Sequence, residues 1–376
     1  MRKFVQRNEA PENGFSPTLS IMKFRGEFAL KFALQSASQH RLPDLVRLAQ
    51  RAHGDGFKQV WVNDNLGQRN VLVVLTAMAA QVPIKLGTSI LVPYFRNPVD
   101  VAGSLAALSE LTDGRELSVG IARGEAAIAG RQIAMLKPLA MVRETTLMLR
   151  ALLGGETVSF RDFPVCAAYH HIHQEQGFRL AFAPAAPIRF YCGGNAPKIL
   201  KIAGEIMDGA LIGDHYIPLV RSGRLDHLLT LQRSAAAEQQ PGKNLFDVCE
   251  LDIAIARDRQ RALEFAKPFV ANILLGLEGA GYSADEMRVL RVEPKLVSAL
   301  KQARAAGATV QSVAALISDE VVQCCYVAGG PEECRDQLAP LLAEAERLKF
   351  GQVAFAKLGP DWNEAMPLLR RQLDHL

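Results

Sequence analysis

Residues 86–98 read LGTSILVPYFRNP, an apolar stretch with two hydroxyl side chains at its centre and a sharp aromatic-arginine-proline ending. The apolar run is typical of a buried strand. Pro93 and the pair Asn97–Pro98 end this strand and begin the next helix, because proline interrupts a sheet and fits the first turn of a helix. The stretch therefore predicts one strand followed by one helix.

The same strand–helix unit recurs along the chain. Short runs rich in β-branched and aromatic residues alternate with helical patterns, and one of these ends at Gly114, a residue type that commonly terminates helices. Eight parallel strands with intervening helices are the number that closes a barrel. The sequence therefore predicts an α/β fold, the TIM (β/α)8 barrel. The predicted strands cover residues 31–35, 58–64, 84–92, 115–121, 188–194, 209–214, 246–256 and 351–359.

Two connections between predicted strands are too long for ordinary barrel loops. Residues 156–187, after the fourth strand, are irregular and rich in Pro, Phe and His, whereas residues 277–327, after the seventh strand, have a helical pattern. Long insertions in this fold usually act as lids or as contacts between subunits. We expect an N-terminal extension over residues 1–27 and a single barrel domain over residues 28–376 that carries both insertions.

Composition excludes several classes of function. The chain has 376 residues, of which 49% are hydrophobic, and its formal net charge of +4 is spread along the sequence, so no nucleic-acid or membrane partner is expected. The first residues lack the apolar core of a signal peptide, and no apolar run approaches the ~20 residues that span a bilayer. The six cysteines form no C-x-x-C pair. We expect a cytoplasmic protein with buried, reduced thiols.

Two acidic residues mark a candidate site at the carboxyl ends of the predicted strands, where barrels of this kind carry their chemistry. Asp64 follows the second strand and is succeeded by Asn65, and Glu125 follows the fourth strand in the segment Ala122–Glu125. A partly buried carboxylate there could serve as a general acid or base. The alternative is a capping or salt-bridging acid, and position alone leaves both interpretations open.

The segment GGNAPK at residues 193–198 lies between the fifth strand and a helix. Two glycines allow the backbone to approach a ligand, and the free N–H groups of a helix start attract phosphate, to which Lys198 would add a positive charge. The alternative is an ordinary glycine-rich turn in which Asn195 caps the helix.

The histidines do not predict a metal site. The tract HHIH at residues 170–173 lies in the first insertion without further ligands at a convincing spacing, and His215 is the one histidine placed at a strand end.

The order of these segments resembles the bacterial luciferase-like superfamily of flavin and deazaflavin oxidoreductases. Further segments resemble its methylene-tetrahydromethanopterin reductase branch, which uses the deazaflavin coenzyme F420. The superfamily resemblance is carried by residues 86–126, 188–213, 326–338 and 350–361, and the branch resemblance by residues 63–71, 137–156 and 203–212.

The resemblance implies where a cofactor would lie. In the deazaflavin enzymes the third strand carries a bulge with a non-prolyl cis peptide behind the cofactor ring, and the matching bond is Ser89–Ile90. Small hydroxylated residues there would let the backbone swell toward the ring without a clash. Lys198 and the residues near it match the region around the cofactor tail. The residues matched to the cofactor site are Asp64, Thr88, Ser89, Ile90, Arg123, Gly124, Gly193, Gly194, Asn195 and Lys198.

The resemblance also implies a catalytic set of Glu125, Asp64 and Asn65. Glu125 matches a carboxylate that acts in proton transfer in the sugar-phosphate dehydrogenase branch, and Asp64 matches an acid that approaches the ring. Relatives often have His where this chain has Asn65, and Asn cannot exchange a proton near neutral pH. The chain therefore either uses Glu125 or catalyses a hydride transfer that needs no acid.

Three functional hypotheses follow. The leading one is an F420-dependent oxidoreductase that transfers hydride between the reduced deazaflavin and an organic, pterin-like substrate. The alternatives are an FMN-dependent monooxygenase of the same fold and a flavin-binding relative that has lost turnover. We expect a small-molecule substrate on the side covered by insertion 156–187, whose aromatic residues would suit a flat ring, although packing of the insertion onto the barrel explains them equally well. We also expect a homo-oligomer, a dimer or tetramer as is usual in the family.

Overall fold

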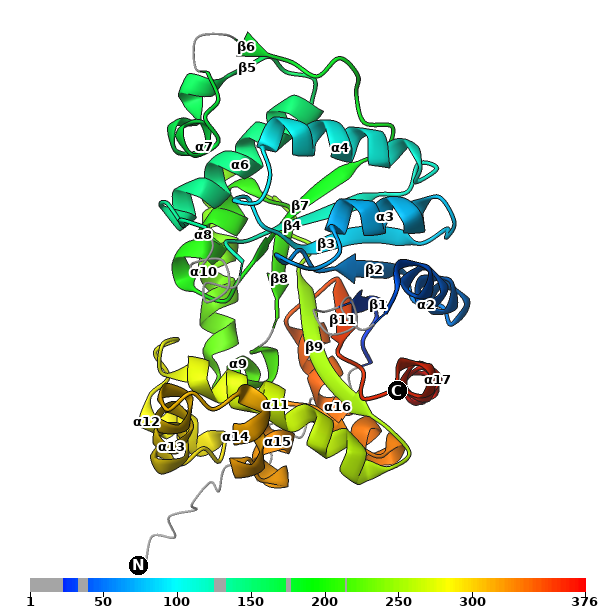
Figure 1. The fold of residues 1–376 in the computed structure, drawn as a ribbon, viewed down its shortest axis with the longest axis vertical. Coiled ribbons are helices and arrows are strands. Elements are labelled where there is room, and N and C mark those ends of the chain that lie inside the picture. Colours follow the sequence, from blue (N-terminus) through cyan, green and yellow to red (C-terminus); the bar gives the residue numbers. More distant parts are fainter. Residues whose placement is uncertain (1–22, 33–39, 125–132, 174–176, 214) are drawn as a thin grey trace, which may run out of the picture.

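Eight parallel strands close into a barrel in the computed structural model, which describes residues 23–32, 40–124, 133–173, 177–213 and 215–376. Strand β1 pairs with both β2 and β11, and β8 pairs with β9, so the sheet has no gap. The predicted TIM barrel is confirmed (Figure 1). Its strands are β1 (Glu27–Phe32), β2 (Gln59–Val62), β3 (Lys85–Leu91), β4 (Leu117–Ile121), β7 (Ile188–Gly193), β8 (Gly209–Ile212), β9 (Val248–Ile255) and β11 (Gln352–Ala356).

The first strand begins earlier than predicted. We placed it at residues 31–35, but β1 starts at Glu27, because Glu27 and Phe28 pair with Gln352 and Val353 of the last strand. This pairing connects the first and last strands of the barrel, so the residues around Glu27 carry no sequence pattern of their own that marks the start of β1. Residues 33–39, which contain the rest of the predicted strand, lie outside the described residues.

Helices surround the barrel and follow its strands. Capping side chains explain several of their starts: Asn97 accepts a hydrogen bond from the N–H of Val99 with Pro98 in the first turn, as predicted, and Asn70 accepts from Leu72. The helices are α2 (Leu42–Gly54), α3 (Val71–Ala79), α4 (Pro98–Glu110), α6 (Pro138–Leu153), α8 (Pro197–Ile206), α9 (Tyr216–Arg221), α10 (Arg224–Gln239), α11 (Arg259–Leu277), α16 (Pro331–Arg347) and α17 (Trp362–Asp374).

The core has two parts. The larger lies between the sheet and the helices, and the smaller fills the middle of the barrel. In this inner layer the rings of Trp61 and Tyr191 meet edge to face with centroids 5.5 Å apart, and the Trp61 indole N–H donates to Gln352 at 2.7 Å. The barrel is thus closed by side chains at its middle, and ligand chemistry is restricted to its ends.

The first insertion packs against α6 and α4, at the top of Figure 1. Its helix α7 begins where the backbone N–H groups of Val165 and Cys166 donate to the Glu144 carboxylate of α6. Its elements are β5 (Val158–Ser159), η2 (Phe160–Asp162), α7 (Pro164–Tyr169) and β6 (Gly177–Phe178).

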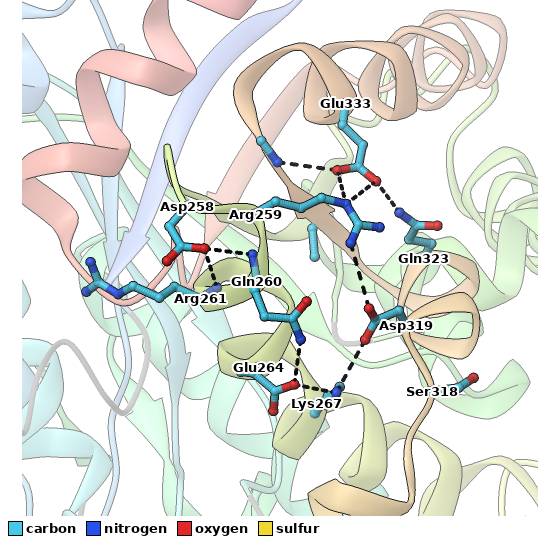
Figure 2. Close-up of polar contacts among 12 residues, drawn as sticks. Asp258, Arg259, Gln260, Arg261, Glu264, Lys267, Ser318, Asp319, Gln323 and Glu333 are labelled. Carbon is cyan, nitrogen blue, oxygen red and sulfur yellow. Dashed lines mark hydrogen bonds and ion pairs between the residues drawn. The ribbon is translucent and has the colours of Figure 1, made fainter.

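The second insertion is helical, as predicted, and lies next to α9 and α11 (Figure 1). It ends in β10, a short strand beside β9 that we did not predict. Figure 2 shows the polar contacts that fasten it, in which Arg259 of α11 bridges Asp319 and Glu333. Its elements are α12 (Ala284–Val289), α13 (Pro294–Ala305), α14 (Val310–Val313), η3 (Ala314–Leu316), α15 (Asp319–Cys325) and β10 (Val327–Gly329).

All six cysteines are buried free thiols, as predicted, and Cys324 and Cys325 belong to helix α15. Burial raises the pKa of the Cys166 thiol to about 11 and that of Cys325 to about 12. None of the helices in the described part of the chain combines the length and apolarity required to cross a membrane.

Candidate active site

The third strand carries the predicted bulge. Its pairing with β4 shifts register between Thr88 and Leu91, and the Ser89–Ile90 peptide bond is cis, as predicted. Thr88 and Ser89 are almost fully buried. The Thr88 hydroxyl donates to the carbonyl of Gly120 on β4 at 3.0 Å, and the Ser89 hydroxyl donates to Glu250 on β9. The two hydroxyls in this apolar strand therefore hold the bulge to other strands.

Glycines on the neighbouring segments leave room for the bulge. A Cβ at Gly193, at the end of β7, would lie 2.5 Å from the Cγ2 of Ile90. A Cβ at Gly124 would lie 2.8 Å from the Cγ2 of Val92, and its φ of +79° favours glycine in any case. Side chains at these two positions would displace the bulge, so the strand ends around it are built for close approach.

Asp64 fastens the bulge to the second strand. Its carboxylate binds the Arg96 guanidinium through two hydrogen bonds, of 2.7 and 2.9 Å, and also accepts from the N–H of Val92 at 3.1 Å. Its own N–H donates to the carbonyl of Ile90 at 3.2 Å. The Asp64 side chain is 1% exposed. A carboxylate committed to a bidentate arginine pair is suited to holding structure in place, and the salt-bridging interpretation of Asp64 fits better than proton transfer.

The end of the fourth strand is described only in part. Arg123 is exposed, and it lies near Tyr94, whose hydroxyl donates to the carbonyl of Leu136 at 2.9 Å. Burial, with the nearby Tyr169 as a smaller cause, raises the pKa of Tyr94 to about 12. Glu125 lies outside the described residues. Its predicted catalytic role therefore stays a prediction.

The start of helix α8 contradicts the interpretation in which Asn195 caps the helix. Asn195 does not cap the helix, because the capping position is Ala196, and the Asn195 amide donates instead to the carbonyl of Gly213 at 2.8 Å. Pro197 has no N–H and the Ile199 N–H donates to the carbonyl of Ala196 at 3.2 Å, so in this first turn the backbone N–H of Lys198 is the group that can bind an anion. Lys198 lies exposed in this first turn, and Gly194 has a φ of +142° that suits glycine.

Sequence reasoning missed a group of charges inside the carboxyl end of the barrel. Lys31 of β1 pairs with Glu250 of β9 at 2.6 Å, and Lys357, just after β11, pairs with Asp252 of β9 at 2.7 Å. The signal was present: the spacing Glu-x-Asp in VCELDIAI puts both carboxylates on the inward face of the strand. A small hollow beside them is lined by Tyr216, Ile217, Glu250, Asp252 and Cys325.

One histidine of the first insertion, His170, has a structural contact. A ring nitrogen of His170 hydrogen bonds to the carbonyl of Pro93 at 2.9 Å, and the rings of Tyr169 and Tyr94 meet edge to face. The insertion therefore touches the turn that follows the bulge. Within the described residues, no group of three His, Cys, Asp or Glu side chains could hold a metal ion.

The residues at this end of the barrel fit a flat cofactor with N–H groups and an anionic tail. The Oδ1 atoms of Asn63 and Asn195 are buried and have no hydrogen-bond partner among the described residues, so each can accept from a ring N–H. The bulge brings Ile90 to this end of the barrel, where Gly193 leaves room for its side chain, and the start of α8 has no side-chain cap that would compete with an anion.

Comparison with known families agrees with this geometry. The model of the luciferase-like monooxygenase family matches residues 26–346. The chain belongs to this family. The match begins just before β1 and ends within α16, before the last strand, β11.

Within the luciferase-like family, curated relatives are similar over most of the chain. The 5,10-methylenetetrahydromethanopterin reductase of Methanolobus tindarius is 26% identical over 355 residues, which cover 92% of this chain and 99% of the relative. The F420-dependent glucose-6-phosphate dehydrogenase of Amycolatopsis mediterranei is 28% identical over 333 residues, 82% of this chain and 87% of the relative.

Solved structures show the same fold. The coenzyme F420-dependent tetrahydromethanopterin reductase of Methanopyrus kandleri superposes with a TM-score of 0.74 at 21% identity, over 93% of this chain and 99% of the other. The monooxygenase RslO1 of Streptomyces bottropensis superposes with a TM-score of 0.60 at 18% identity, over 93% and 98% of the chains.

Proposed function

We propose that this protein is a coenzyme F420-dependent oxidoreductase that transfers hydride between the reduced deazaflavin and an organic substrate, with a pterin-like compound as the leading candidate. The observation that carries the proposal is the bulge at Thr88–Leu91 at the carboxyl end of the barrel, where Gly193 and Gly124 make room for the side chains of Ile90 and Val92. The similarity to methylenetetrahydromethanopterin reductases and F420-dependent dehydrogenases supports the choice of cofactor.

The chain's own residues bind and orient. Half-buried Ile90 lies on the surface for the ring, and the buried Thr88 and Ser89 hold the bulge behind it through their hydroxyls. Asp64 with Arg96 keeps the bulge in place. The uncapped start of α8 with Lys198 receives the anionic tail. When bound, the deazaflavin supplies the hydride, since redox chemistry of this kind belongs to the cofactor.

Proton transfer is assigned to Glu125 or to no residue. Asn65, half-buried beside Asp64, has an amide that cannot exchange a proton near neutral pH. Asp64 is committed to Arg96. A hydride delivered to an iminium-like carbon needs little help from an acid, which agrees with a pterin-like substrate.

The second candidate is an FMN-dependent monooxygenase, which the description of the matching family favours. The two cofactors are distinguished by titrating the purified protein with F420 and with FMN, and by measuring oxygen consumption of each reduced complex. We expect tighter binding of F420 and no oxygen consumption. Tighter binding of FMN together with oxygen uptake would establish the monooxygenase instead.

A protein that binds cofactor without turnover is the third candidate. Activity of the loaded protein with methylene-pterin and sugar-phosphate substrates separates it from the enzymes, and Glu125→Gln tests the proposed acid. We expect turnover with one of these substrates. Cofactor binding without turnover on either class of substrate would favour the non-catalytic relative.

A further inference from the structure

A chain of polar side chains crosses the carboxyl end of the barrel. The Glu250 carboxylate of β9 accepts from the Ser89 hydroxyl of β3 through Oε1 and from the Lys31 ammonium of β1 through Oε2, the latter at 2.6 Å. Strands β3 and β9 are not neighbours in the sheet, so the bond between Ser89 and Glu250 spans the barrel interior. It connects the bulge directly to the opposite wall.

This arrangement is built into the interior. The side chains of Lys31 and Glu250 are 11% and 6% exposed, and burying two charges is costly unless their partners are well placed. Gly213, just after β8, makes the space, since a Cβ there would overlap the Glu250 carboxylate. The ion pair at the other end of the same barrel, Lys85 with Glu27, is 37% and 31% exposed and resembles an ordinary surface contact.

Hydrogen bonds thus hold the bulge on two sides. Asp64 holds its outer side through Ile90 and Val92, and Glu250 holds its inner side through Ser89. Ser89 is 1% exposed, and its hydroxyl donates to the Glu250 carboxylate. Ser89 therefore cannot move unless this hydrogen bond breaks or Glu250 moves with it. A change at Glu250 must therefore be felt at the surface on which a ring would lie.

We propose that Glu250, held by Lys31, is a positioning residue for the cofactor site, and that it acts through Ser89. The inference rests on the proposed function, because it assigns the bulge as the surface against which the ring binds. Loss of the Glu250 side chain then weakens cofactor binding, even though its carboxylate binds Lys31 and Ser89 and not the cofactor.

The test measures the affinity of the full-length protein for F420 by fluorescence titration, alongside thermal unfolding without cofactor. We expect Glu250→Ala to weaken binding about tenfold or more, the scale of a lost hydrogen bond to a charged group. Glu250→Gln keeps an acceptor for Ser89. Combined with Lys31→Met, which removes the cation that Glu250 neutralises in the wild type, it restores affinity to within about threefold of wild type, less than the loss of a hydrogen bond to a charged group.

A double-mutant cycle with Ser89 tests the route. If Glu250 acts through Ser89, the losses of Ser89→Ala and Glu250→Ala are not additive, and the double variant binds about as well as the weaker single variant. The matched control is the pair of changes Glu27→Gln and Lys85→Met at the opposite end of the barrel, for which we expect unchanged affinity.

The outcomes separate this inference from the proposed function. Wild-type protein that binds neither F420 nor FMN overturns the proposed function and the inference with it. Wild-type binding with unchanged affinity of Glu250→Ala, or additive losses in the cycle, overturns the inference alone. If Glu250→Ala does not fold, Ser89→Ala and the Lys31→Met/Glu250→Gln variant carry the test, and normal affinity of Ser89→Ala would then refute it.

Discussion

Replacing Arg96 by Met should destabilise the protein far more than replacing an arginine in a surface pair. The change removes both guanidinium bonds to Asp64, 2.7 and 2.9 Å long, and leaves a carboxylate whose side chain is 1% exposed with one remaining described donor, the Val92 N–H. Removal of one partner of a buried ion pair costs ~3–5 kcal/mol because the other charge stays buried. We expect a loss of that size in the free energy of unfolding, measured by urea denaturation.

Asp64→Asn should lower the free energy of unfolding by less, ~1.5–3 kcal/mol. The amide oxygen can still accept from the Val92 N–H, and the Arg96 side chain, which is 16% exposed, can reach water. The Asp64→Asn/Arg96→Met double variant should lose less than the sum of the two singles, since neither charge is left alone. The control is Arg288→Met, whose pair with Asp285 is 75% and 82% exposed and should contribute at most about 1 kcal/mol.

The Asp64→Asn variant also separates a structural from a catalytic role of Asp64. If the carboxylate only holds the bulge, Asp64→Asn lowers stability and the enzyme that remains folded keeps the pH profile of its turnover. A variant with wild-type stability that has lost turnover would show instead that Asp64 takes part in proton transfer. An Arg96→Met variant as stable as the wild type would contradict the buried-pair argument itself.

Three further results are expected. Gly193→Ala should weaken F420 binding at least about tenfold. Its Cβ would lie 2.5 Å from Cγ2 of Ile90 and would displace the Ile90 side chain, and overpacking of this kind costs ~1–3 kcal/mol. Burial lowers the pKa of His170 below its ordinary value of 6.5. The unfolded chain then takes up the proton first, so the free energy of unfolding should fall as the pH decreases below about 6.5. Urea denaturation between pH 8 and pH 5 measures this change. The Cys166 thiol, with its pKa raised to about 11, should resist a disulfide reagent at pH 8 until denaturant is added.

Each of these results has a control. Gly103→Ala lies on a helix where a Cβ meets nothing within 4 Å, so it should leave F420 affinity unchanged. His170→Gln should flatten part of the pH dependence, and an equal slope in this variant would show that other groups cause it. Rapid modification of all six thiols in the native protein would mean that they are not buried as described.

Most of the barrel could be predicted because each strand carries its own signal. Apolar runs bounded by Gly and Pro located seven of the eight strands within a few residues, and Asn97–Pro98 marked a helix start from local capping chemistry. The start of β1 and the strand β10 were missed, since both are defined by partners more than 60 residues away in sequence rather than by their own residues.

The candidate site was predictable where it depends on backbone shape and missed where it depends on contacts across the barrel. The bulge at Ser89–Ile90 follows from a resemblance in one segment. The partners that hold it, Arg96 and Glu250, could not be identified, because the sequence gives no distance between strand ends. Asn195 resembled a helix cap for the same reason: its true partner, Gly213, follows the next strand, β8.

The central claim is tested most directly by a crystal structure of the protein with coenzyme F420. We expect the deazaflavin ring against the Ser89–Ile90 bulge, with the anionic tail at the start of α8 beside Lys198. A structure with the cofactor bound elsewhere, or with side chains filling the space in front of the bulge, would contradict the claim.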